Sequence, residues 1–177
     1  FINFFLKRSY KQQIVNRVLG AGANYGRSVI GLGTKIQIEF VSANPTGPLH
    51  VGHGRGAAYG ASLANVLAAA GYEVSREYYI NDAGRQMDIL ALSTWLRYLE
   101  AHNEQVPFPP NAYRGDYVRD MAHHLREQYG TKFVRKAHEV LTGLPPLPTT
   151  ENVDASASAQ RETHLDALIT KAKTLLG

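Results

Sequence analysis

The 177-residue sequence contains no cysteine. This absence excludes disulfide bonds and zinc sites built on thiolates, and it suits a reducing compartment, so we expect a cytoplasmic protein. The sequence also lacks any apolar run close to the roughly 20 residues that a membrane helix requires, and it shows no secretory signal. We therefore expect no membrane partner.

A strong charge of either sign is also missing. The formal net charge is +4 and the pI is about 9.3, which permits an anionic partner without requiring one. Hydrophobic residues make up 44% of the chain, enough for a packed core. The length fits one domain or a piece of a longer protein. Because the first residue is Phe1 rather than methionine, we expect a piece.

Two runs have the two-residue period of a strand, at 35–41 and 72–80. Each is followed by a helical pattern, at about 55–70 and 85–101. Strand, helix, strand and helix at this spacing predict a parallel βαβ unit. The fold class is therefore α/β, with a Rossmann-like parallel sheet.

The regions on either side of this unit have other patterns. A short amphipathic helix is predicted over 10–19, followed by a glycine-rich loop without a phosphate-loop motif. After a proline-rich link, helices are predicted around 118–125, 133–141 and 165–176, with a polar loop over 143–160. We expect three parts: 1–34, 35–104, and a mainly helical insertion over 105–177 with a flexible loop near 144–160.

The junction between the first strand and its helix carries two histidines, His50 and His53. In open α/β sheets, ligands bind in the crevice at the carboxyl ends of the strands. The helix N-terminus there offers free N–H groups and a positive potential, which suit a phosphate group. Imidazole groups can donate N–H bonds to phosphate oxygens, and the neighbouring Gly52 and Gly54 leave room for a nucleotide.

Two other interpretations of the histidines stay open. They could be solvated loop residues or caps of the helix, which is the common role for an isolated polar residue at a junction. They could also be metal ligands, with Asp82 as a candidate third ligand, but two histidines alone do not define a metal site.

The sequence also contains residues that fit a dinucleotide-binding fingerprint. Gly52, Gly54 and Ala57 fit its spacing, and Glu73 or Glu77 lies about 20 residues further on. The fingerprint requires its first glycine directly after the strand, whereas eight residues with two prolines intervene here. We therefore do not expect an NAD site.

The stretch "SANPTGPLHVGH" (42–53) strongly resembles the signature of class I aminoacyl-tRNA synthetases, in which a His-x-Gly-His box begins the first catalytic helix. The segments "AAGYEVSREYYINDAGRQM", "FINFFL", "WLRYLE" and "YRGDYV" resemble bacterial arginyl-tRNA synthetases in particular. The likeness extends over about Phe1 to Tyr129. It implies the nucleotidyl-transferase (HUP-type) version of the Rossmann-like sheet, and it makes 1–34 the end of an N-terminal tRNA-binding domain.

The resemblance also assigns roles to individual residues. His50 and His53 would be the catalytic residues that stabilise charge on the phosphate oxygens of ATP. Gly52 and Gly54 would bind ATP beside them. Ser42 and Asn44, with His53 close by, would contact L-arginine.

Residues outside these motifs have less specific expectations. We expect Asp82 to cap the following helix, and Tyr78 and Tyr79 to lie in the core or at its rim. Gln86 could face the site. The larger remaining set, expected to be exposed, comprises Arg114, Arg119, His123, His124 and Arg126.

The function implied is ATP-dependent activation of L-arginine and its transfer to tRNA-Arg, with ATP and Mg²⁺ required and no metal bound by the protein itself. The resemblance implies a monomer at full length. The second half of the nucleotide fold, the lysine-containing signature loop and the anticodon-binding domain should lie beyond Gly177, so we expect this piece alone to be inactive. The alternatives are another class I synthetase or a related nucleotidyltransferase, and a non-catalytic nucleic-acid-binding module.

Overall fold

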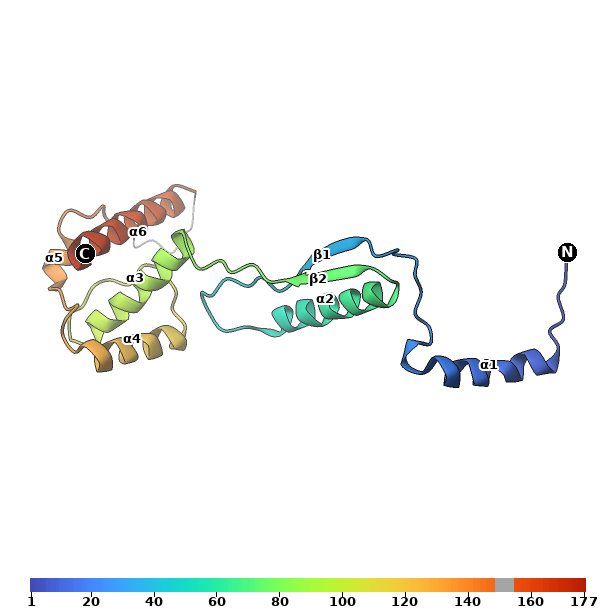
Figure 1. The fold of residues 1–177 in the computed structure, drawn as a ribbon. Coiled ribbons are helices and arrows are strands. Elements are labelled where there is room, and N and C mark those ends of the chain that lie inside the picture. The colour runs from blue at the N-terminus through green and yellow to red at the C-terminus, as the bar shows by residue number, and fades with distance from the viewer. Residues whose placement is uncertain (149–154) are drawn as a thin grey trace. The chain divides into compact units, whose positions relative to one another are not determined.

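The computed structural model describes residues 1–148 and 155–177. Figure 1 labels its elements, which are α1 (Arg8–Ala21), η1 (Gly22–Asn24), β1 (Lys35–Glu39), α2 (Val51–Ala69), β2 (Glu73–Glu77), α3 (Arg85–Glu100), α4 (Asp116–Tyr129), α5 (Ala137–Leu141) and α6 (Ala155–Leu176). The chain divides into two compact units. Unit 1 comprises Phe1–Ala43 and Leu49–Tyr79, and unit 2 comprises Asn44–Pro48 and Ile80–Gly177.

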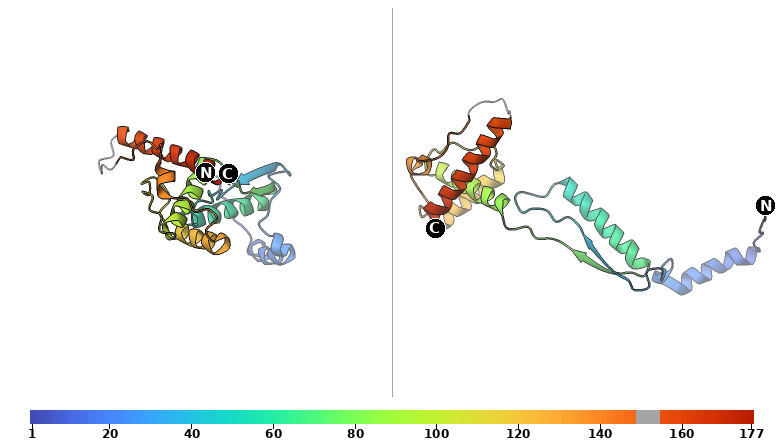
Figure 2. Two further views of the ribbon diagram at one scale, coloured as in Figure 1. Left: turned by 90° about the vertical axis from the view of Figure 1, so that its left-hand side faces the viewer. Right: turned by 90° about the horizontal axis from the view of Figure 1, so that it is seen from above.

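Unit 1 contains the predicted βαβ arrangement. Strands β1 and β2 pair in parallel, with Lys35 opposite Glu73 and Glu39 opposite Glu77. The connecting helix α2 packs on both strands, and Figure 2 shows it lying along them in two views. Burial alternates along β1, where Ile36 is half-buried between exposed polar neighbours, as a strand with one covered face requires. The α/β class and the parallel pairing are confirmed.

Both strands are shorter than the sequence predicts. Strand β1 ends at Glu39 and β2 at Glu77, whereas the alternating patterns extend to 41 and 80. The reason at the first strand is visible in the backbone, because Val41 and Ser42 have φ angles of 70° and 41°. Left-handed residues cannot continue a strand, so the chain turns away there.

Unit 2 is built around α3, which packs against α4 and α6. Nine of the sixteen residues of α3 are buried, so the helix is covered on several sides. The indole N–H of Trp95 donates to the Phe133 carbonyl at 2.9 Å, and the Tyr98 hydroxyl donates to the Gly130 carbonyl at 2.6 Å. Helix α3 therefore belongs to the helical unit, although the sequence groups it with the strands in a 35–104 segment.

Two helix boundaries also differ from prediction. Helix α6 begins at Ala155, so 155–160 are helical rather than part of the expected loop, which suits the good helix-forming alanines there. Helix α5 begins at Ala137 rather than at Phe133. The part of the predicted flexible loop at 149–154 lies outside the described residues. In the described parts of the chain, no helix is both long and apolar enough to span a bilayer.

Candidate functional site

The two histidines at the start of α2 cap the helix reciprocally. His50 is the N-cap residue, and its Nδ1 accepts a hydrogen bond from the N–H of Gly52 at 3.1 Å. The Nδ1 of His53 accepts in turn from the N–H of His50 at 3.1 Å. The two rings stack with centroids 3.9 Å apart. This arrangement satisfies two N–H groups that a helix start leaves free, and it explains why α2 begins at Val51 rather than near 55.

The same hydrogen bonds fix the tautomer of each ring. A nitrogen that accepts a hydrogen bond carries no proton, so the hydrogen-bond pattern assigns the proton of each neutral imidazole to Nε2. Each Nε2–H forms no hydrogen bond to the described residues and can donate to an anion. The capping interpretation is therefore correct, and it leaves the phosphate-donor interpretation possible, because the two roles use different nitrogens of the ring.

The two glycines of this turn differ in what a larger side chain would meet. A Cβ at Gly52 would lie 2.8 Å from Cε1 of His50, so the capping ring itself requires glycine at that position. A Cβ at Gly54 would meet nothing within 4 Å among the described residues. The space beside Gly54 is open to a ligand, as the ATP prediction for this residue requires. Because Gly52 and Gly54 both lie inside α2, they do not form the strand-to-helix turn of a dinucleotide site.

The end of β1 holds Ser42 in a defined position. The Ser42 hydroxyl donates to Oε1 of Glu39 at 2.6 Å and accepts from the N–H of Tyr79 at 3.1 Å. The Tyr78 hydroxyl donates to the Ala43 carbonyl at 3.1 Å. Two consecutive left-handed residues, one of them β-branched, are costly by roughly 1–3 kcal/mol each, and such backbone strain concentrates at functional sites.

Sequence reasoning missed Glu39. It is the last residue of β1, and its exposed carboxylate is bonded to a predicted arginine-binding residue. A carboxylate is the group that pairs best with a guanidinium. The available signal was the position of an acidic residue at the carboxyl end of a strand, three residues before Ser42.

Asn44 lies in unit 2, where two side chains hold its amide. Its Nδ2 donates to Oε1 of Gln86 at 2.7 Å, and its Oδ1 accepts from Nδ2 of Asn81 at 2.7 Å. Gln86 therefore contacts Asn44, and its place at a substrate site stays a prediction. The prediction that Asp82 caps the next helix is wrong, since α3 has Gly84 as its N-cap without a side-chain hydrogen bond.

The remaining predicted residues lie at the surface. Tyr78 and Tyr79 are 51% and 61% exposed, so neither is a core residue. Arg119 pairs with Asp116 at 3.4 Å within α4. Arg114, His123, His124 and Arg126 are exposed, as expected. Within the described residues, no group of three or more His, Asp or Glu could hold a metal ion.

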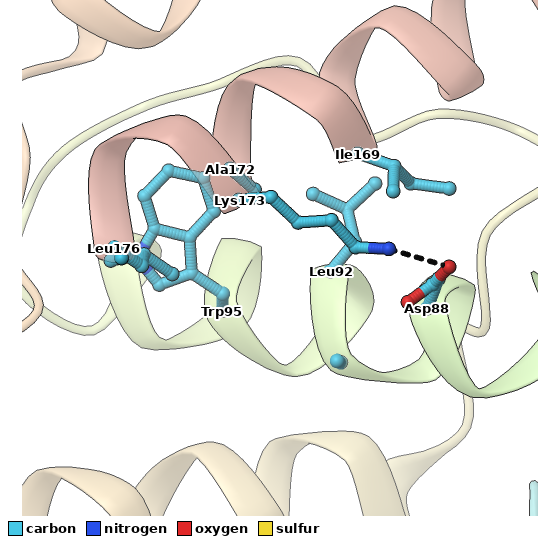
Figure 3. Close-up of a pocket in the computed structure, with 9 residues that line it drawn as sticks. Asp88, Leu92, Trp95, Ile169, Ala172, Lys173 and Leu176 are labelled. Atoms are coloured by element: carbon cyan, nitrogen blue, oxygen red, sulfur yellow. Dashed lines mark hydrogen bonds and ion pairs between the residues drawn. The ribbon is translucent and has the colours of Figure 1, made fainter. Parts of the chain in front are cut away.

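The clearest cavity in unit 2 is a groove between α3 and α6, of about 230 Å³. Figure 3 shows its apolar walls, with Leu92 near Ile169 and Trp95 beside Leu176, and the ion pair between Lys173 and Asp88 at one rim. None of the predicted site residues lines it. The groove is therefore not built from the residues predicted to act at the start of α2.

Comparisons with known proteins bear on the whole chain. Residues 15–145 match the family model described as tRNA synthetases class I (R), catalytic domain. Over its full length the chain is 64% identical to the arginine–tRNA ligase of Dechloromonas aromatica (strain RCB) and 61% identical to that of Azoarcus sp. (strain BH72). The identity is 52% with the arginine–tRNA ligase of Coxiella burnetii (strain CbuG_Q212). The chain spans about 30% of the length of these relatives.

Proposed function

Because the chain belongs to the family of class I (R) tRNA synthetase catalytic domains, we propose that the protein containing it activates L-arginine with ATP and transfers it to tRNA-Arg. The observation that carries this proposal is the capped histidine pair, which directs two Nε2–H donors away from the first turn of α2. The supporting relatives are themselves named arginine–tRNA ligases.

The histidine pair suits the first chemical step. Attack of the arginine carboxylate on the α-phosphate of ATP forms the adenylate and releases pyrophosphate, while negative charge builds up on the phosphate oxygens. Fixed donors that bind this charge more tightly in the transition state lower the barrier. His50 and His53 supply such donors, and their capping bonds hold the rings in place before ATP arrives. Gly52 and Gly54 leave space for the adenosine.

The arginine side of the reaction needs both neutral and acidic groups. Ser42 and Asn44 offer hydroxyl and amide groups for the α-amino and carboxylate groups of the substrate, with His53 as a further contact. Glu39 supplies a carboxylate for the cationic guanidinium. For Mg²⁺, the described residues offer no cluster of three His, Asp or Glu ligands.

Charge segregation supports an RNA partner. Residues 1–38 contain six Lys and Arg residues and no Asp or Glu, so this segment is more basic than the whole chain. The side chains of Lys7, Arg8 and Lys11 are exposed, and they form no ion pair within the described residues. Cationic side chains without acidic partners bind phosphate backbones and release counterions. We therefore propose that this segment contacts tRNA.

We further propose that the protein acts in the cytoplasm as a monomer. The 177-residue piece alone does not activate arginine.

The first experiment measures arginine-dependent ATP–pyrophosphate exchange by the full-length protein, with and without tRNA-Arg. His53→Asn places an amide oxygen where Nδ1 accepts, which keeps the cap, and removes the Nε2–H donor. We expect an exchange rate at least about 100-fold lower with an unchanged melting temperature. His53→Gln is the matched variant, because its amide nitrogen reaches the Nε2 position, and it should retain more activity than His53→Asn.

The outcomes separate the possible functions. Activation of a different amino acid would keep the synthetase class and reject arginine as the substrate. Exchange that is unaffected by His53→Asn would reject the role of the histidines. Binding of tRNA without any exchange would favour a non-catalytic nucleic-acid-binding module.

A further inference from the structure

The segment "YRGDYV" (113–118) has no role in the function proposed above, yet one of its side chains reaches the loop that carries Asn44. The hydroxyl of Tyr117, in the first turn of α4, donates to the carbonyl of Thr46 at 2.7 Å. Thr46 lies two residues after Asn44, and both belong to Asn44–Pro48, a loop that is part of unit 2. The contact therefore connects α4 to a predicted arginine-binding residue within one compact unit.

One glycine makes room for the Tyr117 ring, and a second lies in ordinary contact with it. A Cβ at Gly115 would lie 2.3 Å from Cε1 of Tyr117, so that position accepts only glycine while the ring stays where it is. A Cβ at Gly47 would lie 3.4 Å from the Tyr117 hydroxyl oxygen and 3.5 Å from Cζ. The ring is thus in close contact with its own turn and with the Asn44–Pro48 loop. Such packing holds the hydroxyl on the Thr46 carbonyl.

The base of this contact is rigid because α4 is anchored in the core. Val118, next to Tyr117, is fully buried, and α4 packs along α3. The N–H of Tyr113 donates at 3.0 Å to the hydroxyl of Ser93, which is itself fully buried on α3. Burial also raises the pKa of the Tyr117 hydroxyl, which therefore remains a proton donor throughout the neutral range.

Hydrogen bonds hold the Asn44–Pro48 loop at two points. Gln86 and Asn81 hold the amide of Asn44, and Tyr117 holds the backbone two residues later. The Asn44 amide keeps one N–H and one lone pair for a substrate, and their direction depends on the backbone of the loop. We propose that Tyr117 is a positioning residue, which acts through the Thr46 carbonyl to orient Asn44 toward the amino-acid substrate. This inference rests on the proposed function.

The test is Tyr117→Phe in the full-length protein, assayed by arginine-dependent ATP–pyrophosphate exchange in the presence of tRNA-Arg. The change removes one hydroxyl and keeps the ring, so the fold should be retained. We expect KM for arginine to rise roughly 3- to 10-fold, the effect of losing one hydrogen bond. KM for ATP should stay constant, because the ATP donors are on α2. A purely structural role would instead lower the amount of active enzyme and leave both KM values unchanged.

The matched control is Tyr113→Phe, in the same segment, whose hydroxyl makes no hydrogen bond to the described residues. It should leave both KM values at wild-type levels. A double-mutant cycle with Asn44→Ala then tests whether Tyr117 acts through Asn44. If it does, Tyr117→Phe should raise KM for arginine little further once the Asn44 side chain is absent. Equal KM values for Tyr117→Phe and Tyr113→Phe, or full additivity with Asn44→Ala, would overturn the inference. If the wild-type protein activates no arginine, the proposed function itself is wrong.

Discussion

Leu19 and Leu99 are the same residue type on two helices of the chain, yet Leu19 of α1 is 75% exposed and Leu99 of α3 is fully buried. The contrast holds for the two units as wholes. The buried residues of unit 1 are all small, namely Gly31, Ala43, Gly60 and Ala64. Unit 2 instead buries large side chains such as Tyr98, Leu165 and Leu168. Stability is therefore concentrated in unit 2, whereas all the predicted site residues except Asn44 lie in unit 1.

The predicted site residues and the packed core of this chain therefore lie in different segments. A two-stranded sheet with one covering helix buries too little apolar surface to be stable alone. In the described residues, unit 1 also leaves large apolar side chains such as Ile30 and Val66 in solvent. Unit 2 has a contiguous core of its own. Mutations in the core of unit 2 should therefore change mainly the stability, and mutations of the predicted site residues in unit 1 mainly the activity.

The largest effect is expected from paired leucine truncations. Leu99→Ala should lower the free energy of unfolding by about 2–5 kcal/mol, because it leaves a cavity in a packed core. Leu19→Ala should cost less than about 0.5 kcal/mol, because the side chain is already in solvent. Urea unfolding followed by circular dichroism, and by the fluorescence of the single tryptophan, Trp95, measures both. Similar losses for the two variants would contradict the comparison.

A pair of glycines on α2 tests a tightly packed contact of unit 1. A Cβ at Gly60 would lie 2.3 Å from Cγ of Phe40, so Gly60→Ala should destabilise unit 1 by about 1–3 kcal/mol. A Cβ at Gly56 would meet nothing within 4 Å of the described chain, so Gly56→Ala should stabilise the helix by about 0.8 kcal/mol. Thermal unfolding followed by circular dichroism should show melting temperatures that move in opposite directions. A stabilising Gly60→Ala would show that Phe40 is loosely held.

A smaller effect should appear as the pH dependence of unit 2. Hydrogen bonds from Asn111 and Arg85 hold the pKa of Glu162 below its ordinary value of 4.5, and hydrogen bonds from Lys136 and the Ala137 N–H lower the pKa of Glu104. The unfolded state then binds protons at a higher pH than the folded state. The contribution of both carboxylates is therefore complete above about pH 4.5 and is lost as the pH falls through the lowered pKa values.

The free energy of unfolding, followed by the fluorescence of Trp95, should fall less steeply below pH 4.5 in the double variant Glu104→Gln/Glu162→Gln than in the wild type. Glu127→Gln is the control, because the Glu127 carboxylate forms no ion pair or hydrogen bond with the described residues. It should leave the pH profile unchanged. A double variant with the wild-type profile would mean that neither carboxylate is bonded in solution.

The smallest effect is expected at the rim of the groove between α3 and α6. Lys173 Nζ lies 2.9 Å from Oδ2 of Asp88, and both side chains are partly exposed. Lys173→Met removes the charge and keeps most of the stem that packs beside Trp95. Exposed ion pairs contribute little, so the melting temperature should shift by less than about 3 °C. A larger drop in a calorimetric scan would show that the ion pair is shielded from solvent.

The helices of unit 2 could be predicted because their apolar residues recur with helical spacing. Val118 and Ala122 on α4, like Leu165 and Leu168 on α6, follow that pattern and are buried. The helical pattern placed the start of α2 near 55 rather than at Val51, because histidine is not among the usual capping residues and capping was only one of the interpretations open for the pair. The role of the capping histidine depends on a second ring three residues later.

The candidate site was predictable only where the sequence itself brings residues together. His50 and His53 are three residues apart, so their proximity follows from the helix. Tyr117 and Thr46 are 71 residues apart, and the contact between Asn44 and Gln86 joins residues 42 apart. Such contacts depend on how α3 and α4 pack, which no local pattern encodes. The Glu39–Ser42 bond was missed for another reason, since it requires the left-handed turn at Val41 and Ser42.

That left-handed turn has a consequence for the thermodynamics of ligand binding. Val41 and Ser42 have already lost their backbone freedom when the protein folds, and hydrogen bonds hold Ser42 in place without a ligand. A ligand that contacts Ser42 meets a preorganised surface and does not have to order it, so the entropic penalty of association is smaller. Calorimetry of such binding should show little of the unfavourable entropy that accompanies the ordering of a flexible loop.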